Sequence, residues 1–161
     1  MKDTQTDSNK SAGSGSGSLS SIDMSTMDAC IEHAKEIKAT QLELIKSKRY
    51  DFAPEFRDMT IQLYLFGVMW KFAETLGNGS EARELSFVAM RTMLVQEGWS
   101  PRKAAKRIEF LRKMAKLEDG HDAMAVIVGY ESVSGDNSLA EVYDHYVDDM
   151  QVSGAFWRLY D

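Results

Sequence analysis

Histidine and carboxylate pairs are the residues of this sequence that could hold a metal ion. His33 and Glu36 are three residues apart, and His145 lies four residues from both Glu141 and Asp149. On helices, each set would share one face. Di-metal carboxylate bundles use two Glu-x-x-His motifs and two further glutamates, and this sequence does not contain two such motifs. We therefore interpret these side chains as surface charge, and we predict no metal site and no cofactor.

Nucleophilic and phosphate chemistry have little support in the sequence. Cys30 is the only cysteine, and it falls within a predicted helix without an evident activating partner. The glycine-rich segments at residues 13–17 and 77–79 lack the lysine and the strand–turn–helix setting of a phosphate-binding loop. We interpret them as linker and turn, and we predict that the protein is not an enzyme.

Residues 98–116 reverse the charge of the rest of the chain. They carry seven basic residues and one acid, Glu109, in a protein whose net charge is −6. The preceding segment EGWS and the basic helix resemble a helix-turn-helix, whose second helix can lie in the major groove of DNA. The candidate nucleic-acid-binding residues are Arg102, Lys103, Lys106, Arg107, Arg112 and Lys113.

Two features weigh against DNA binding. Arg107 falls where a recognition helix usually turns an apolar residue inward, and the basic residues spread over more than one helix face. The acidic net charge also disfavours a general nucleic-acid binder. We therefore favour a solvated cationic helix that docks on acidic neighbours such as Asp144, Asp148 and Asp149, with nucleic acid as the alternative partner.

The last residues of the sequence, AFWRLYD, are unusually aromatic. Leaving so much apolar surface in water is unfavourable, and Trp and Tyr are enriched at binding hot spots. Either the tail packs on its own bundle near Tyr143 and Tyr146, or it docks on a partner protein or a second copy of the chain. The candidate partner-binding residues are Phe156, Trp157, Leu159 and Tyr160.

The element that must position these groups is the stretch from Phe56 to Leu76. Nearly every residue between 61 and 72 is apolar, and a helix that is apolar all round is buried or spans a membrane. A span needs about twenty apolar residues, so we predict a core helix and no membrane span. Leu63 and Trp70 should be among its most buried side chains. Gly67 costs helix stability, which indicates that another backbone passes close to it.

Caps, turn residues and apolar spacing predict the remaining helices. Val126 to Val128 favour a strand by propensity, but no partner strand is evident, so we predict a helix there. The fold class is all-α, an antiparallel bundle of five to six helices around a buried central helix. The predicted helices begin at Ser25, Pro54, Glu81 and Pro101, with two more over residues 121–133 and 138–150.

The predicted organisation is a disordered Ser/Gly-rich tail or linker over residues 1–24 and a single helical domain over residues 25–161. With one cysteine and no secretory signal, we expect a cytoplasmic protein. A Ser-rich N-terminus also occurs in proteins delivered by bacterial secretion machines, which is the alternative. We expect a protein–protein interaction module, such as an adaptor, regulator, chaperone or inhibitor, that binds a partner protein or self-associates.

Overall fold

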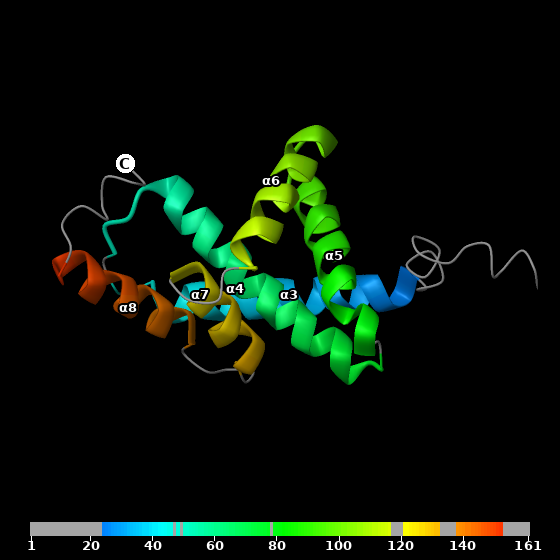
Figure 1. Cartoon of the computed structure of the whole chain (residues 1–161), viewed down its shortest axis with the longest axis horizontal. Helices are drawn as coiled ribbons and strands as arrows, with labels where there is room; N and C mark the ends of the chain where they lie inside the picture. Colours follow the sequence, from blue (N-terminus) through cyan, green and yellow to red (C-terminus); the bar gives the residue numbers. More distant parts are fainter. Residues whose placement is uncertain are drawn as a thin grey trace, which may run out of the picture.

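The chain folds into helices throughout the part that the structure describes. The computed structural model describes residues 24–46, 48, 50–77, 79–116, 121–132 and 138–152. Its helices in these ranges are α3 (Met24–Leu44), α4 (Pro54–Thr75), the short 3-10 turn η1 (Gly79–Glu81), α5 (Ala82–Gln96), α6 (Pro101–Met114), α7 (His121–Glu131) and α8 (Ser138–Val152) (Figure 1). The all-α class is confirmed, and the prediction of a helix over 121–133 is confirmed for residues 121–131, while residue 133 lies outside the described residues. The tail predicted over residues 1–24 lies outside the described residues, except Met24, which begins α3.

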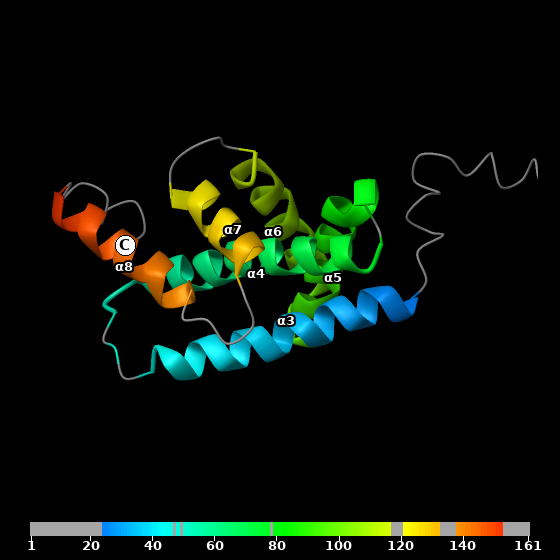
Figure 2. The same ribbon diagram turned by 90° about the horizontal axis from the view of Figure 1, so that it is seen from below.

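Helix α4 is the centre of the molecule. In Figure 2, α3 lies on one side of α4 and α7 on the other, while α8 lies at the end where α4 begins. Every residue from Gln62 to Met69 is buried, as expected of a helix that is apolar all round. Leu63 is fully buried, which confirms its prediction.

The prediction for Trp70 is wrong, because this side chain is only partly buried. Its ring lies at the side of α4, 5.6 Å from the guanidinium carbon of Arg83 and 5.1 Å from the ring of Tyr130. The indole therefore covers the core from outside, held by a cation–π contact and an edge-to-face aromatic contact.

Helices α4 and α7 touch backbone to backbone at two glycines. A Cβ atom on Gly67 would lie 2.7 Å from the backbone nitrogen of Tyr130 and closer still to the carbonyl oxygen of Val126. A Cβ on Gly129 would lie 2.9 Å from the carbonyl carbon of Tyr64. The close approach predicted at Gly67 is confirmed. Each helix has a glycine at the point of contact, because the space that a side chain would need is filled by the backbone of the other helix.

Helices α5 and α6 lie side by side and run steeply across the direction of α3 (Figure 1). Gly98, between them, has a φ angle of 106°, a conformation that residues with a side chain rarely adopt. Ser100 caps α6, since its hydroxyl accepts a hydrogen bond of 3.1 Å from the backbone N–H of Lys103. Pro101 occupies the first turn, and α6 begins at this residue as predicted.

The apolar character of α4 is that of a protein core. Among the helices that the structure describes, none is both long and apolar enough to cross a bilayer.

Candidate functional site

Helix α6 buries one narrow stripe of side chains. Ala104, Ile108 and Leu111 are buried, and their spacing of four and three places them on one side of the helix. This side packs mainly on α5. The basic residues therefore divide into those that reach back beside this stripe and those that face solvent.

Arg107 is one of the basic residues that reach back. Its side chain is only 15% exposed. Nη1 donates a hydrogen bond of 2.6 Å to Oε1 of Gln62 on α4, and Nη2 lies 3.7 Å from the carboxylate of Glu55. The guanidinium also lies 5.1 Å from the ring of Trp99. Arg107 therefore occupies the inward-facing position of α6 that the sequence indicated. An arginine is accommodated there because Gln62 and Glu55 of α4 supply polar partners.

Arg112 attaches the other end of α6 to α5. Its Nη1 donates to Oε1 of Glu84 at 2.6 Å, and its Nη2 donates to Oε2 of the same carboxylate. The guanidinium carbon lies 4.4 Å from the ring of Phe87. The hydrogen bond from Arg112 lowers the pKa of Glu84, as expected for a bidentate charged pair.

The acidic partners of α6 differ from those expected. The sequence suggested the aspartates of α8, whereas α6 forms its ion pairs with Glu55 and Glu84. Asp144 instead binds Lys48 and Tyr50. Helical spacing showed that α6 carries excess positive charge, but it could not show which acids the fold brings next to it.

The remaining basic side chains of α6 face solvent, and the ring of Phe110 lies among them. Lys106 and Lys113 are exposed and, within the described ranges, their side chains form no ion pair or hydrogen bond. Lys103 is exposed, with its ammonium 4.4 Å from the ring of Trp99. Phe110 is 39% exposed and lies four residues from Lys106 and three from Lys113, on the same face. We call Lys103, Lys106, Phe110 and Lys113 the cationic face.

Arg102 and Lys116 extend this surface at its two ends. Both are exposed and have no charged or hydrogen-bonded side-chain partner among the residues described. Phe110 was not singled out in the sequence. The available signal was an aromatic residue outside the stripe of Ala104, Ile108 and Leu111, in the middle of a charged helix.

The other candidate groups are in settings that suit packing. Cys30 is fully buried, and burial raises its pKa to about 11, so little reactive thiolate forms at neutral pH. His33 stacks on Phe72 with ring centroids 4.2 Å apart, and burial lowers its pKa. Within the described ranges, no three His, Cys, Asp or Glu side chains gather closely enough to hold a metal ion.

The four aromatic and leucine residues predicted to bind a partner lie outside the described residues. Their role stays a prediction; they are Phe156, Trp157, Leu159 and Tyr160.

Comparison of the chain with protein-family models, with curated proteins and with solved structures found no match. The function is therefore inferred from the side chains and their arrangement.

Proposed function

We propose that this chain acts by binding another protein and that the cationic face of α6 is the contact surface. The observation that carries the proposal is Phe110, 39% exposed between two lysines that have no partner in the described part of the chain. An aromatic residue surrounded by polar or charged groups is the usual composition of an interface, with the ring buried on binding and the charges at the rim.

The charges indicate the kind of partner. Because Lys106 and Lys113 flank Phe110, the complementary surface carries carboxylates around an apolar depression that receives the ring. The lysines would mainly raise the association rate and select against basic surfaces, while burial of the ring supplies affinity. The lysines can do this because Glu55 and Glu84 are already occupied by Arg107 and Arg112.

DNA is the second candidate partner. Arg102, Lys103 and Lys106 are exposed in the first turns of α6, where the recognition helix of a helix-turn-helix contacts bases. Two of the seven basic residues already pair with acids of the same chain, Arg107 with Glu55 and Arg112 with Glu84, so fewer charges are left for phosphates. An exposed phenylalanine in the middle of the face also suits a protein surface better than a phosphate backbone.

The proposal is tested by a pair of double variants with the same chemical change. Lys106→Glu with Phe110→Ser alters the cationic face. Arg91→Glu with Val95→Ser makes the same kind of change, at the same spacing, on exposed residues of α5; Val95 is 38% exposed and Phe110 is 39% exposed. Parent and variants are used as affinity baits in an extract of the native host, before and after nuclease treatment.

We expect one stoichiometric protein with the parent and the α5 variant, unaffected by nuclease and lost with the α6 variant. The purified partner should then bind the parent in calorimetry, with an affinity that falls as salt rises. Equal retention by all three baits would contradict the proposal.

DNA binding is tested separately with a duplex in a mobility-shift assay at about 150 mM salt. We expect no retention of the duplex. A shift that weakens steeply with salt and disappears on changing the exposed Arg102, Lys103 and Lys106 to Glu would favour the second candidate, because each neutralised phosphate releases counterions.

A further inference from the structure

A second surface feature lies away from the cationic face, at the end of the molecule formed by the connector between α3 and α4. It is a hollow of about 300 Å³ between the end of α3, the connector, the start of α4 and α8. Leu42, Ile45 and Ile61 give it an apolar side, and Arg57, Asp58 and Tyr143 contribute polar groups. Its volume is at the lower end of the range for small-molecule sites, which is about 300–1,000 Å³.

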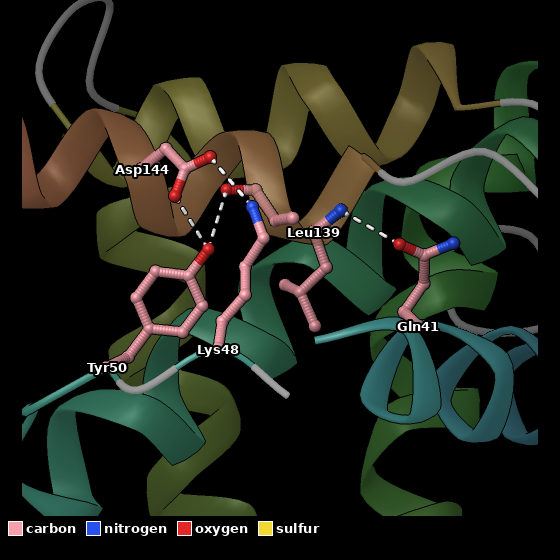
Figure 3. A network of polar contacts seen from close by, with 6 residues as sticks. Gln41, Lys48, Tyr50, Leu139 and Asp144 are labelled. Atoms are coloured by element: carbon pink, nitrogen blue, oxygen red, sulfur yellow. Dashed lines mark hydrogen bonds and ion pairs between the residues drawn. The ribbon is translucent and has the colours of Figure 1, made fainter. Parts of the chain in front are cut away.

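Polar contacts hold the walls of this hollow together (Figure 3). The hydroxyl of Tyr50 donates a hydrogen bond of 2.7 Å to Oδ1 of Asp144, and Nζ of Lys48 lies 3.3 Å from Oδ2 of the same residue. On the neighbouring turn of α8, the backbone N–H of Leu139 donates to Oε1 of Gln41 at 3.0 Å. Helix α8 is therefore fastened both to α3 and to the connector, the two segments that form one side of the hollow.

Aromatic packing fixes Tyr143 at the base of the hollow. Its ring makes edge-to-face contacts with Tyr50 and Phe52, at centroid distances of 4.9 Å and 5.2 Å. Tyr143 is 2% exposed, yet its hydroxyl has no hydrogen-bond partner in the part of the chain that the structure describes. A buried hydroxyl without a partner is uncommon, because its lost contact with water is not replaced.

Two charged groups of the hollow act on this hydroxyl. Burial raises the pKa of Tyr143, the guanidinium of Arg57 lowers it, and the carboxylate of Asp58 raises it. The hydroxyl therefore stays protonated at neutral pH and is available as a donor. Arg57 is exposed, and its side chain forms no ion pair or hydrogen bond within the described ranges. The guanidinium of Arg57 is thus an exposed donor beside the apolar wall, and the enclosed hydroxyl of Tyr143 is a second donor that a ligand reaches when neighbouring side chains shift.

We propose that this hollow binds a small carboxylic acid with a compact apolar body. The carboxylate would accept hydrogen bonds from Arg57 and from the hydroxyl of Tyr143, and the apolar body would rest on Leu42, Ile45 and Ile61. A carboxylate suits the planar guanidinium. Asp58 at the rim makes a monoanion a better fit than a doubly charged phosphate, because its repulsion grows with the charge of the ligand.

The site is tested on the full-length, isotope-labelled chain by NMR titration with phenylacetate, with neutral phenylacetamide as the matched ligand. We expect saturable shifts for residues around the hollow with phenylacetate and at least about tenfold weaker binding of the amide, because the charged pair with Arg57 is lost. Three single variants are titrated beside the parent: Arg57→Gln, Tyr143→Phe and, as a control on exposed α5, Arg91→Gln.

We expect Arg57→Gln to weaken phenylacetate binding about tenfold or more and Arg91→Gln to leave it unchanged. Tyr143→Phe should weaken binding severalfold, yet it should not lower the melting temperature, because the hydroxyl that it removes has no partner in the free protein. This combination separates a ligand contact from a structural role. Equal binding of acid and amide, equal affinity in Arg57→Gln and Arg91→Gln, or no saturable shifts at millimolar phenylacetate would overturn the proposal.

Discussion

Helix α7 and helix α6 are held against the rest of the molecule by opposite kinds of contact. At the α4–α7 crossing, Gly67 and Gly129 bring two backbones into contact, with carbonyl and amide groups where side chains would normally lie. Helix α6 is held instead by long charged side chains, with Arg107 reaching Gln62 and Arg112 reaching Glu84. The α4–α7 contact requires that two residues carry no side chain, whereas the attachment of α6 requires long, charged side chains.

The difference explains why the candidate interface lies on α6. At the crossing, the contact atoms of Gly67 and Gly129 are enclosed by the two helices. On α6, the arginines that face inward also cover apolar rings such as Phe87 and Trp99 with their guanidinium groups. Lys106 and Lys113, on the other side, make no ion pair or hydrogen bond within the described ranges and are therefore not needed for attachment. A helix held by a few long side chains can present its remaining surface to another molecule.

The largest effect is expected at the crossing itself. Gly67→Leu should abolish cooperative unfolding or destabilise the protein by at least about 3 kcal/mol, because even the first side-chain atom would overlap the backbone of α7. The measurement is urea unfolding followed by circular dichroism.

Gly98→Leu is the matched control for this variant. A Cβ there would meet no atom within 4 Å, but its φ angle of 106° disfavours a side chain. The control should therefore cost only about 1–2 kcal/mol of backbone strain. Equal losses in the two variants would contradict a close α4–α7 contact.

Within α4, removing a buried side chain should be less severe than adding one at the crossing. Leu63 is fully buried, and Leu63→Ala should lower the free energy of unfolding by about 2–5 kcal/mol through lost burial and a residual cavity. Thermal and denaturant unfolding measure the loss. A variant that melts within a degree or two of the parent would show that this face of α4 is not tightly packed.

The contacts that hold α6 should contribute less to the free energy of unfolding than the space at Gly67 or the side chain of Leu63. Arg112→Gln and Glu84→Gln, combined in a double-mutant cycle, should give a coupling energy of about 0.5–1.5 kcal/mol, because the pair is bidentate but partly exposed. Lys113→Gln, one residue further along α6, controls for a change of charge alone and should be neutral within about 0.5 kcal/mol. A coupling energy of zero would show that the pair does not hold α6.

The smallest effect is a pH dependence of stability that arises from the Glu84–Arg112 pair between α5 and α6. Arg112 lowers the pKa of Glu84 in the folded state, so the unfolded chain binds a proton at this carboxyl at a higher pH than the folded chain does. The stabilisation is present above the unfolded pKa and is lost as the pH falls through the folded one. As the pH falls below 4.5, the ordinary pKa of a glutamate, the parent should progressively lose its stability advantage over Glu84→Gln. A difference that does not change with pH would refute this assignment.

Local rules predicted most of the helices and part of the crossing. The fully apolar run predicted α4, and the unfavourable glycine within this helix indicated a close neighbour at Gly67. Its counterpart, Gly129, was not recognised, because the surrounding apolar run fits a strand as well as a helix. Trp70 was misjudged because an all-round apolar pattern does not reveal which positions lie at the edge of the core.

The site residues were harder to predict, because their partners are distant in the sequence. Arg107 was recognised as anomalous on its helix, but Gln62 and Glu55 belong to α4, and nothing in the periodicity of α6 points to them. The hollow at Tyr143 combines residues from α3, the connector, α4 and α8. Its polar groups are ordinary in their own segments and become a candidate site only when the fold brings them together.

The paired glycines also fix the axial register of α7. If α7 moved along α4 by one residue and turned about its own axis to match, Val128 or Tyr130 would take the place of Gly129, and a side chain would have to occupy space already filled by the backbone of α4. Four methionines lie in the buried core of the described chain, Met59, Met69, Met90 and Met93, and methionine side chains tolerate many similar arrangements. The crossing removes those alternatives and widens the energy gap between the native packing and its near competitors.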